Sequence, residues 1–332
     1  MSSNGNFPAL VEAFFTDRLM RQRQASPHTI ASYRDSFRLL IDYAERRLKK
    51  SPSNLDLEDL DAPFLVAFLD HLEDERGNGA RTRNLRLTAI HSFFRYVAFQ
   101  KPDRSSFIQR ILAIPSKRFA RRLIAFLSRP EIEALLSAPD RTTWRGRRDH
   151  ALLTVAIQTG LRVSELIGLR CEDVILGPGA HVRCQGKGRK ERSTPLGKRP
   201  RAILQAWLRE RAGHPSDPVF PSSRGGALSR DAVEDLLAKH VATARKACPT
   251  LKNKRVSPHV TRHSTAMQLL QAGVDRSVIA LWLGHESVET TQIYIDADLA
   301  LKQKVVEKAA PPGARTGRFR PADRLLAFLT SL

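Results

Sequence analysis

Apolar positions in the N-terminal third of the chain recur at intervals of three and four residues, the spacing of one face of an α-helix. Ser26 and Pro27 form a typical helix start, with serine as the cap and proline in the first turn. Gly77 and Gly79 interrupt the helical pattern before it resumes. The sequence therefore predicts a small helical domain, with helices over 7–22, from 27 through 43, over 61–74 and over 80–99.

A second region begins near Leu127, where Ser128 and Glu131 have the spacing of a capping box. Residues 149–158 are almost wholly apolar, so we expect a buried helix that ends at Gly160. Turn sequences then separate three short β-like runs, at 173–176, 181–184 and 191–196. The remainder has helical patterning, with N-caps expected at Ser229, Ser257 and Asp275. The predicted fold class is mainly α, with two domains and one small antiparallel sheet in the second.

The chain carries a strong positive charge. It has 55 Lys and Arg against 34 Asp and Glu, a formal net charge of +21 and a pI near 10.7. Such a charge attracts a polyanion, and nucleic acid is the leading partner. A membrane surface is the competing partner, but we find no apolar run long enough to span a bilayer and no basic-apolar signal at the N-terminus. We therefore expect no membrane partner.

The charge is concentrated between residues 76 and 122, where twelve Lys and Arg accompany a single acid, Asp103. A solvated helix face is the ordinary explanation of a charge run, but such faces normally mix both signs. A near-absence of acids favours contacts with DNA phosphates. The candidate DNA-binding residues are Arg81, Arg83, Arg86, Arg95, Lys117, Arg118, Arg121 and Arg122.

Three cysteines, Cys171, Cys184 and Cys248, are widely spaced and match no zinc-binding pattern. They are typical of a reducing compartment, and we expect a cytoplasmic protein. No cluster of acids and histidines has the spacing of metal ligands. We therefore expect neither a metal nor another cofactor.

Two pairs of residues suit the binding of a phosphate. Arg162 and Glu165 lie three apart near a helix start, so the carboxylate can hold the guanidinium in place for the oxygens of one phosphate. His259 and Arg262 repeat this spacing in the first turn of a later helix, where free amides also favour anions. Taken alone, the first pair is better explained as a surface ion pair and the second indicates a site only weakly, since a solvated helix face also accounts for it. We interpret His263 as structural.

Three further residues complete the candidate chemistry. Lys187 lies in a glycine-rich turn between two predicted strands, where Arg189, Lys190 and Arg192 compete for the same role. His285 follows a predicted helix end at Gly284, and Tyr294 comes nine residues later. A phenol can attack a phosphate, whereas cations and imidazoles can bind and protonate it.

The order and spacing of these residues resemble the tyrosine recombinase (phage integrase) family, and within it the Xer-like and transposon-borne recombinases. The resemblance rests on TGLRVSEL (159–166), GKGRKER (186–192), HVTRH (259–263) and LGH (283–285) with Tyr294 beyond it. It implies an N-terminal core-binding (SAM-like) domain and a catalytic domain. By position, it assigns phosphate binding and acid–base roles to Arg162, His259, Arg262 and His285, the hairpin lysine to Lys187 and the nucleophile to Tyr294.

The implied activity is site-specific recombination of double-stranded DNA through a 3′-phosphotyrosyl intermediate, by a tetramer on two duplexes. An accessory recombinase or a DNA-bending protein is a possible further partner. We place the core-binding domain at 1–110, a basic linker at 111–127, the catalytic domain at 128–310 and a linker with an apolar tail at 311–332. The segment 322–332 is expected to dock on a neighbouring protomer or, about equally, on its own domain.

Other functions remain open at this point. A type IB topoisomerase would use similar chemistry and reseal the same strand, whereas a DNA-binding protein without catalysis would need only the basic N-terminal region. A metal-dependent nuclease would need clustered carboxylates, which the sequence lacks. Chromosome dimer resolution, integration and transposition are equally compatible with these motifs.

Overall fold

The computed structural model describes residues 7–119, 124–186 and 191–284. It divides the chain into two compact units, Met1–Arg121 and Arg122–Leu332. Several predicted site residues lie outside the described ranges: Lys187, His285, Tyr294, Arg121 and Arg122, together with the segment 322–332.

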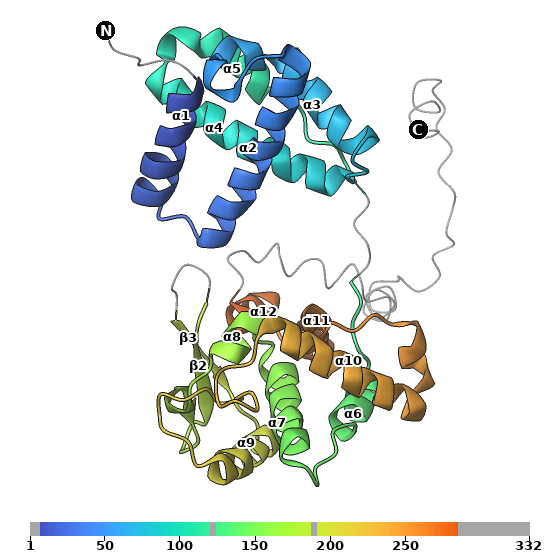
Figure 1. Cartoon of the computed structure of the whole chain (residues 1–332). Helices are drawn as coiled ribbons and strands as arrows, with labels where there is room; N and C mark the ends of the chain where they lie inside the picture. The colour runs from blue at the N-terminus through green and yellow to red at the C-terminus, as the bar shows by residue number, and fades with distance from the viewer. Residues whose placement is uncertain (1–6, 120–123, 187–190, 285–332) are drawn as a thin grey trace, which may run out of the picture. The chain divides into compact units, whose positions relative to one another are not determined.

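All the regular secondary structure in the described part of the first unit is helical (Figure 1). Ser26 accepts a hydrogen bond from the Thr29 amide and so begins its longest helix, as the sequence predicted. Its core is rich in phenylalanine, and the ring of Phe93 lies 5.5 Å from that of Phe14 and 5.2 Å from that of Phe37. The helices are α1 (Phe7–Ala13), its π-helical continuation (Phe14–Gln22), α2 (Pro27–Leu48), α3 (Ala62–Asp74), α4 (Ala80–Gln100) and α5 (Ser105–Leu112).

The first unit extends beyond its last predicted helix. Helix α5 was not predicted, and its Ile108 and Ile111 are buried in the same core. Beyond it, the Pro115 carbonyl accepts from Arg83, while the Lys117 backbone exchanges two hydrogen bonds with the side chain of Asn84. Residues 111–117, which the sequence assigned to a linker, therefore lie against α4.

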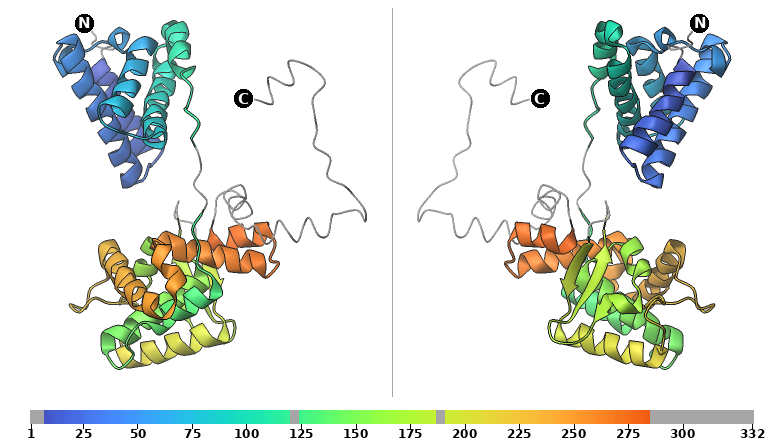
Figure 2. Two further views of the ribbon diagram at one scale, coloured as in Figure 1. Left: turned by 90° about the vertical axis from the view of Figure 1, so that its right-hand side faces the viewer. Right: turned by 90° about the vertical axis from the view of Figure 1, so that its left-hand side faces the viewer.

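The second unit combines helices with one small antiparallel sheet, as expected, and the sheet flanks the helices (Figure 2). The strands follow the order β1-β2-β3, and Val182 pairs with Thr194. The strands are β1 (Val174–Ile175), β2 (His181–Gln185) and β3 (Glu191–Pro195). The helices are α6 (Arg129–Ser137), α7 (Trp144–Thr159), α8 (Val163–Gly168), α9 (Lys198–Arg211), α10 (Arg230–Ala247), α11 (Pro258–Gln271) and α12 (Arg276–Leu283).

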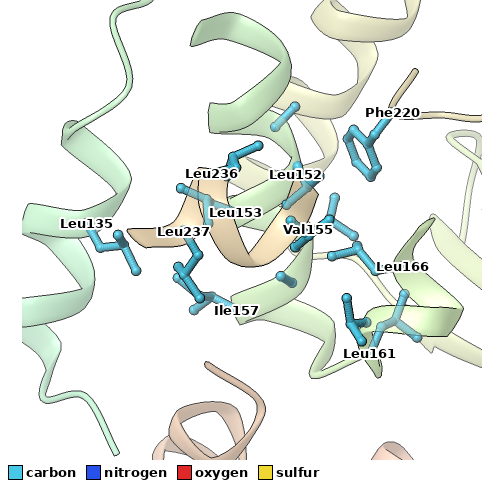
Figure 3. Close-up of a cluster of buried hydrophobic side chains, with 14 of the residues drawn as sticks. Leu135, Leu152, Leu153, Val155, Ile157, Leu161, Leu166, Phe220, Leu236 and Leu237 are labelled. Carbon is cyan, nitrogen blue, oxygen red and sulfur yellow. The ribbon is translucent and has the colours of Figure 1, made fainter. Parts of the chain in front are cut away.

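Helix α7 is the centre of this unit. Leu152, Leu153 and Val155 are buried in the main apolar cluster, where Leu236 and Leu237 of α10 also lie (Figure 3). The prediction of a buried helix is confirmed, although the helix begins earlier, at Trp144, because Thr143 accepts a hydrogen bond from the Gly146 amide. It ends at Gly160 with φ of 63°. The loop that carries Arg162 therefore starts from a rigid support.

A buried polar group fastens α7 to α10. Asp149 accepts hydrogen bonds from Arg148, at 2.9 and 2.7 Å, and from His240 of α10, at 2.9 Å. All three side chains are at most 9% exposed. Since buried charges require partners, this group fixes how the two helices meet.

Candidate active site

Arg162 is the residue that caps α8, and its own side chain is held from two directions. Its amide donates to Glu165 Oε2 at 2.7 Å, and its Nη1 donates to Glu165 Oε1 at 2.8 Å. Its Nη2 donates to the Gly284 carbonyl at 3.0 Å. The three-residue spacing predicted the pairing with Glu165, whereas the contact with Gly284 joins residues 122 positions apart.

Arg262 lies one turn into α11 and is 5% exposed. Its Nη1 donates to the Gly160 carbonyl at 2.5 Å, and its Nη2 donates to the Leu283 carbonyl at 2.6 Å. The side chain thus crosses from α11 to both the end of α7 and the end of α12. Neither contact follows from local sequence spacing.

The two arginines converge on consecutive peptide groups. Arg262 holds the carbonyl of Leu283 and Arg162 holds that of Gly284, at the point where α12 ends. Gly284 has φ of 64°, which directs the backbone out of the helix. Two guanidinium groups and the peptide immediately before His285 are therefore brought together from three separate stretches of chain.

Glu165 joins a third arginine to this group. Arg192 of β3 donates to both carboxylate oxygens, at 2.9 and 2.7 Å. Burial alone would raise the pKa of Glu165, but the hydrogen bonds and charges of Arg192 and Arg162 outweigh it and lower the pKa to about 2. Glu165 is therefore ionised at neutral pH. Arg192, which the sequence offered as an alternative to Lys187, is committed to this carboxylate.

The two histidines of α11 differ in surroundings. His259 is exposed, yet its pKa is lowered by partial burial and by the nearby charges of Arg230, Arg262 and Arg162. It is therefore neutral at pH 7 and can accept a proton. His263 is more enclosed, and burial with the neighbouring His259 and Arg262 lowers its pKa to about 4. This enclosure agrees with the structural role expected of it.

The candidate DNA-binding residues of the first unit fall into two groups. Arg81, Arg95, Lys117 and Arg118 are exposed, although Lys117 also bonds Glu73 at 2.6 Å. Arg83 is 3% exposed and pairs with Glu73, while half-buried Arg86 donates to Ser32 and Ser36. Arg83 and Arg86 lie at helical spacing from Leu87 and Ile90, which places them on the inner face of α4. This spacing is visible in the sequence, but the prediction of DNA-binding residues rested on the excess of positive charge alone.

Other kinds of site are not found within the described ranges. Residues 7–119, 124–186 and 191–284 contain no group of three His, Cys, Asp or Glu side chains that could hold a metal ion. The described helices include none that is long and apolar enough to cross a membrane. Cys171, Cys184 and Cys248 are all free thiols.

Comparisons with known proteins agree with this geometry. The family model described as "Phage integrase family" matches residues 125–300, and "Phage integrase, N-terminal SAM-like domain" matches residues 13–101. The chain is 59% identical to y4rC of Sinorhizobium fredii, a candidate integrase/recombinase, over the whole of both proteins. It is 33% identical to tyrosine recombinase XerC of Pelobacter propionicus, over 91% of this chain and 95% of XerC.

A solved structure shows the same likeness. The XerH site-specific recombinase, in a post-cleavage complex with a palindromic difH substrate, superposes with a TM-score of 0.69 at 25% identity. The match covers 86% of this chain and 80% of that one. The chain thus belongs to the phage integrase family of tyrosine recombinases, the enzymes of site-specific recombination that cleave and rejoin DNA.

Proposed function

We propose that this chain binds double-stranded DNA at specific sites and exchanges strands through a covalent bond between Tyr294 and a DNA 3′-phosphate. The observation that carries the proposal is the convergence of Arg162 and Arg262 on the Leu283 and Gly284 carbonyls. Two guanidinium groups held this close can donate to the non-bridging oxygens of one phosphate. Their charge would stabilise the additional negative charge of a pentacovalent phosphorus.

The proposed reaction follows from these positions. The Tyr294 oxygen attacks phosphorus, its proton passes to a base, and the 5′-oxygen leaves with a proton from an acid. A free phenol has a pKa of about 10, so it needs nearby cations or a base to react at neutral pH. Neutral His259 is the proposed base, Lys187 the acid and His285 a further donor. Attack by a 5′-hydroxyl of another duplex reverses the step, and the phosphodiester energy is conserved.

We propose that both domains contact the duplex, with 1–110 and the packed residues 111–117 as the core-binding domain, the rest of the segment up to 127 as the linker and 128–310 as the catalytic domain. The exposed cations Arg81, Arg95, Lys117 and Arg118 supply phosphate contacts. Arg83 and Arg86 are reassigned to the support of α4, because their charges are used inside the unit.

We also propose a tetramer on two duplexes, since strand exchange needs two cleavages on each duplex. The tail 322–332 would link neighbouring protomers in a closed ring. Deletion of 321–332 should then leave binding to a single site intact and abolish pairing of two sites. A truncated chain that recombines at the normal rate overturns this part of the proposal.

The decisive experiment uses nicked duplexes made from the DNA that flanks the chain's own gene, in buffer with EDTA. The wild-type chain should form a covalent adduct that survives denaturation and contains Tyr294, whereas Tyr294→Phe should bind the same DNA and form none. An adduct in the variant transfers the nucleophile to another residue. Binding without any wild-type adduct favours a non-catalytic protein, and relaxation of supercoils without exchange favours a topoisomerase.

A further inference from the structure

Arg192 occupies an inward-facing position of the small sheet. In the β2–β3 register Arg192 pairs with Cys184, and Thr194 pairs with Val182. Cys184, Thr194 and Val182 are all buried. The alternating positions of β3, Glu191, Ser193 and Pro195, are exposed. An inward position of a sheet that covers a core ordinarily holds an apolar side chain. An arginine there requires a partner inside the domain.

Its partner is the carboxylate that also holds Arg162. Arg192 donates through Nη1 and Nη2 to the two oxygens of Glu165, and Arg162 donates to the same oxygens through Nη1 and its amide. The Glu165 side chain is 3% exposed, so these four donors supply the hydrogen bonds that water would give to an exposed carboxylate. One negative charge is thus shared between two guanidinium groups.

This sharing has an electrostatic consequence. A carboxylate paired with Arg162 alone would cancel the charge that Arg162 offers to a phosphate. With Arg192 added, the three side chains carry a net charge of one positive unit, and Arg162 still has a fixed orientation. Glu165 and Arg192 together therefore fix the orientation of Arg162 and leave a net positive charge for a phosphate.

Arg192 also touches the peptide that precedes His285. A Cβ atom added to Gly284 would lie 2.7 Å from Arg192 Nη1, so the guanidinium packs directly against that glycine. The carbonyl of Gly284 is the same group that accepts from Arg162 Nη2. In the sequence, Arg192 follows closely after Lys187. Arg192 is thus linked to three of the segments that carry proposed catalytic residues.

We propose that Arg192 is a positioning residue of the strand-cleavage reaction, which aims Arg162 through Glu165 and sets the backbone before His285. The inference rests on the proposed function. Arg192 acts through its two-pronged bond to Glu165, without itself contacting DNA. The competing explanation is a buried ion pair that only stabilises the domain.

The test compares Arg192→Gln, Arg192→Lys and the control Arg183→Gln, all in the full chain. Arg183 lies on β2 with an exposed side chain, and its described hydrogen bond goes to the Glu172 carbonyl. On the nicked duplexes described above, Arg192→Gln should lower the single-turnover rate of adduct formation about 100-fold, since a small displacement of a clamp has this effect. DNA affinity should change by less than about threefold. The control should cleave as the wild type does.

The pH profile separates positioning from stability. Without Arg192, Glu165 loses the strongest of the interactions that keep it ionised, so it should protonate at higher pH. The rate of Arg192→Gln relative to wild type should fall further between about pH 7 and pH 5. Arg192→Lys keeps the charge but not the two-pronged bond, so it should lose about tenfold and show no added pH dependence.

Glu165→Gln provides a second comparison. If both residues act on Arg162 as one unit, the double variant Glu165→Gln, Arg192→Gln should be no slower than the slower single variant. The inference is overturned if the rate loss of the double variant equals the product of the losses of the two single variants. It is also overturned if Arg192→Lys cleaves at the wild-type rate, or if Arg192→Gln and Arg183→Gln cleave at equal rates. If Arg192→Gln does not fold, the rate of adduct formation by Arg192→Lys tests the inference instead. A wild-type chain that forms no adduct instead overturns the proposed function itself.

Discussion

Arg262 Nη1 donates a 2.5 Å hydrogen bond to the carbonyl oxygen of Gly160, two residues before Arg162. The two proposed clamps of a phosphate are therefore coupled through the backbone that ends α7. Gly160 can serve this role because it adopts φ of 63° and has no side chain. A Cβ atom at this position would lie 2.6 Å from Leu283 Cδ2, beside the other carbonyl that Arg262 holds.

Gly160→Ala should consequently impair both stability and cleavage. The left-handed backbone conformation alone costs about 1–2 kcal/mol for a residue with a side chain, and the contact with Leu283 adds to it. Urea denaturation and adduct formation would measure the two effects. Gly179→Ala is the matched control, because Gly179 has φ of 69° but open space around its Cβ position. Equal cleavage by both variants would contradict the coupling through Gly160.

Arg162→Ala and Arg262→Ala should each lose most of the cleavage rate, by about 100-fold or more, while specific DNA binding is largely retained. The reason is that a clamp acts mainly on the charge that develops during the reaction, whereas affinity comes from many cations. Single-turnover rates and binding isotherms on the same nicked duplexes measure this. A parallel fall of rate and affinity would show that these arginines only bind DNA.

The buried Asp149 should contribute far more to stability than a neighbouring surface pair. Asp149→Ala leaves Arg148, whose side chain is 9% exposed, without its carboxylate, and should cost about 3–5 kcal/mol. Glu210→Ala removes the partner of Arg147, whose side chain is 37% exposed, and should cost far less, because solvent screens an exposed pair. The two arginines are adjacent on α7, so urea denaturation of both variants isolates the effect of burial. Similar losses would contradict this explanation.

His263 should make stability depend on pH in the mildly acidic range. Its folded-state pKa of about 4 lies below the ordinary value of 6.5, so the unfolded chain binds more protons between these values. Stability should therefore rise with pH from about 4 to about 6.5, by up to roughly 3 kcal/mol from this residue, and level off above. His263→Gln should flatten this rise in urea midpoints measured at pH 5 and pH 7.5. If stability rises with pH as steeply in His263→Gln as in the wild type, other titrating groups cause the rise.

Arg81 and Arg83 should behave differently although they lie two residues apart on α4. Arg81→Gln removes an exposed cation and should reduce the slope of log affinity against log salt by about 0.9. Arg83→Gln removes the partner of Glu73 and of the Pro115 carbonyl, so it should lower stability and leave that slope unchanged. Binding titrations at several salt concentrations, with thermal unfolding alongside, test this pair. The reverse result would restore Arg83 to the DNA-contacting surface.

Interactions between close neighbours in the chain could be predicted from the sequence. Ser128 and Glu131 form the expected capping box, Gly160 ends α7, and Glu165 meets Arg162 at the expected spacing. These features depend on helix geometry over one turn, which the local sequence contains. The order of the motifs likewise predicted the family from the sequence alone. The expected N-cap at Asp275 also forms, through a bond from the Ser277 amide.

Only the tertiary structure decided which cations stay exposed and which are bonded inside the protein. Before the family resemblance assigned Lys187, the sequence offered Arg192 for the same role, yet Arg192 meets Glu165, 27 residues away, in the interior of its domain. Arg83 and Arg81 were likewise equivalent until packing buried one of them. The meeting of Arg262 with Gly160 spans 102 residues. A charge acquires its role from the burial and partners that distant segments provide, and these arise only when the segments pack together.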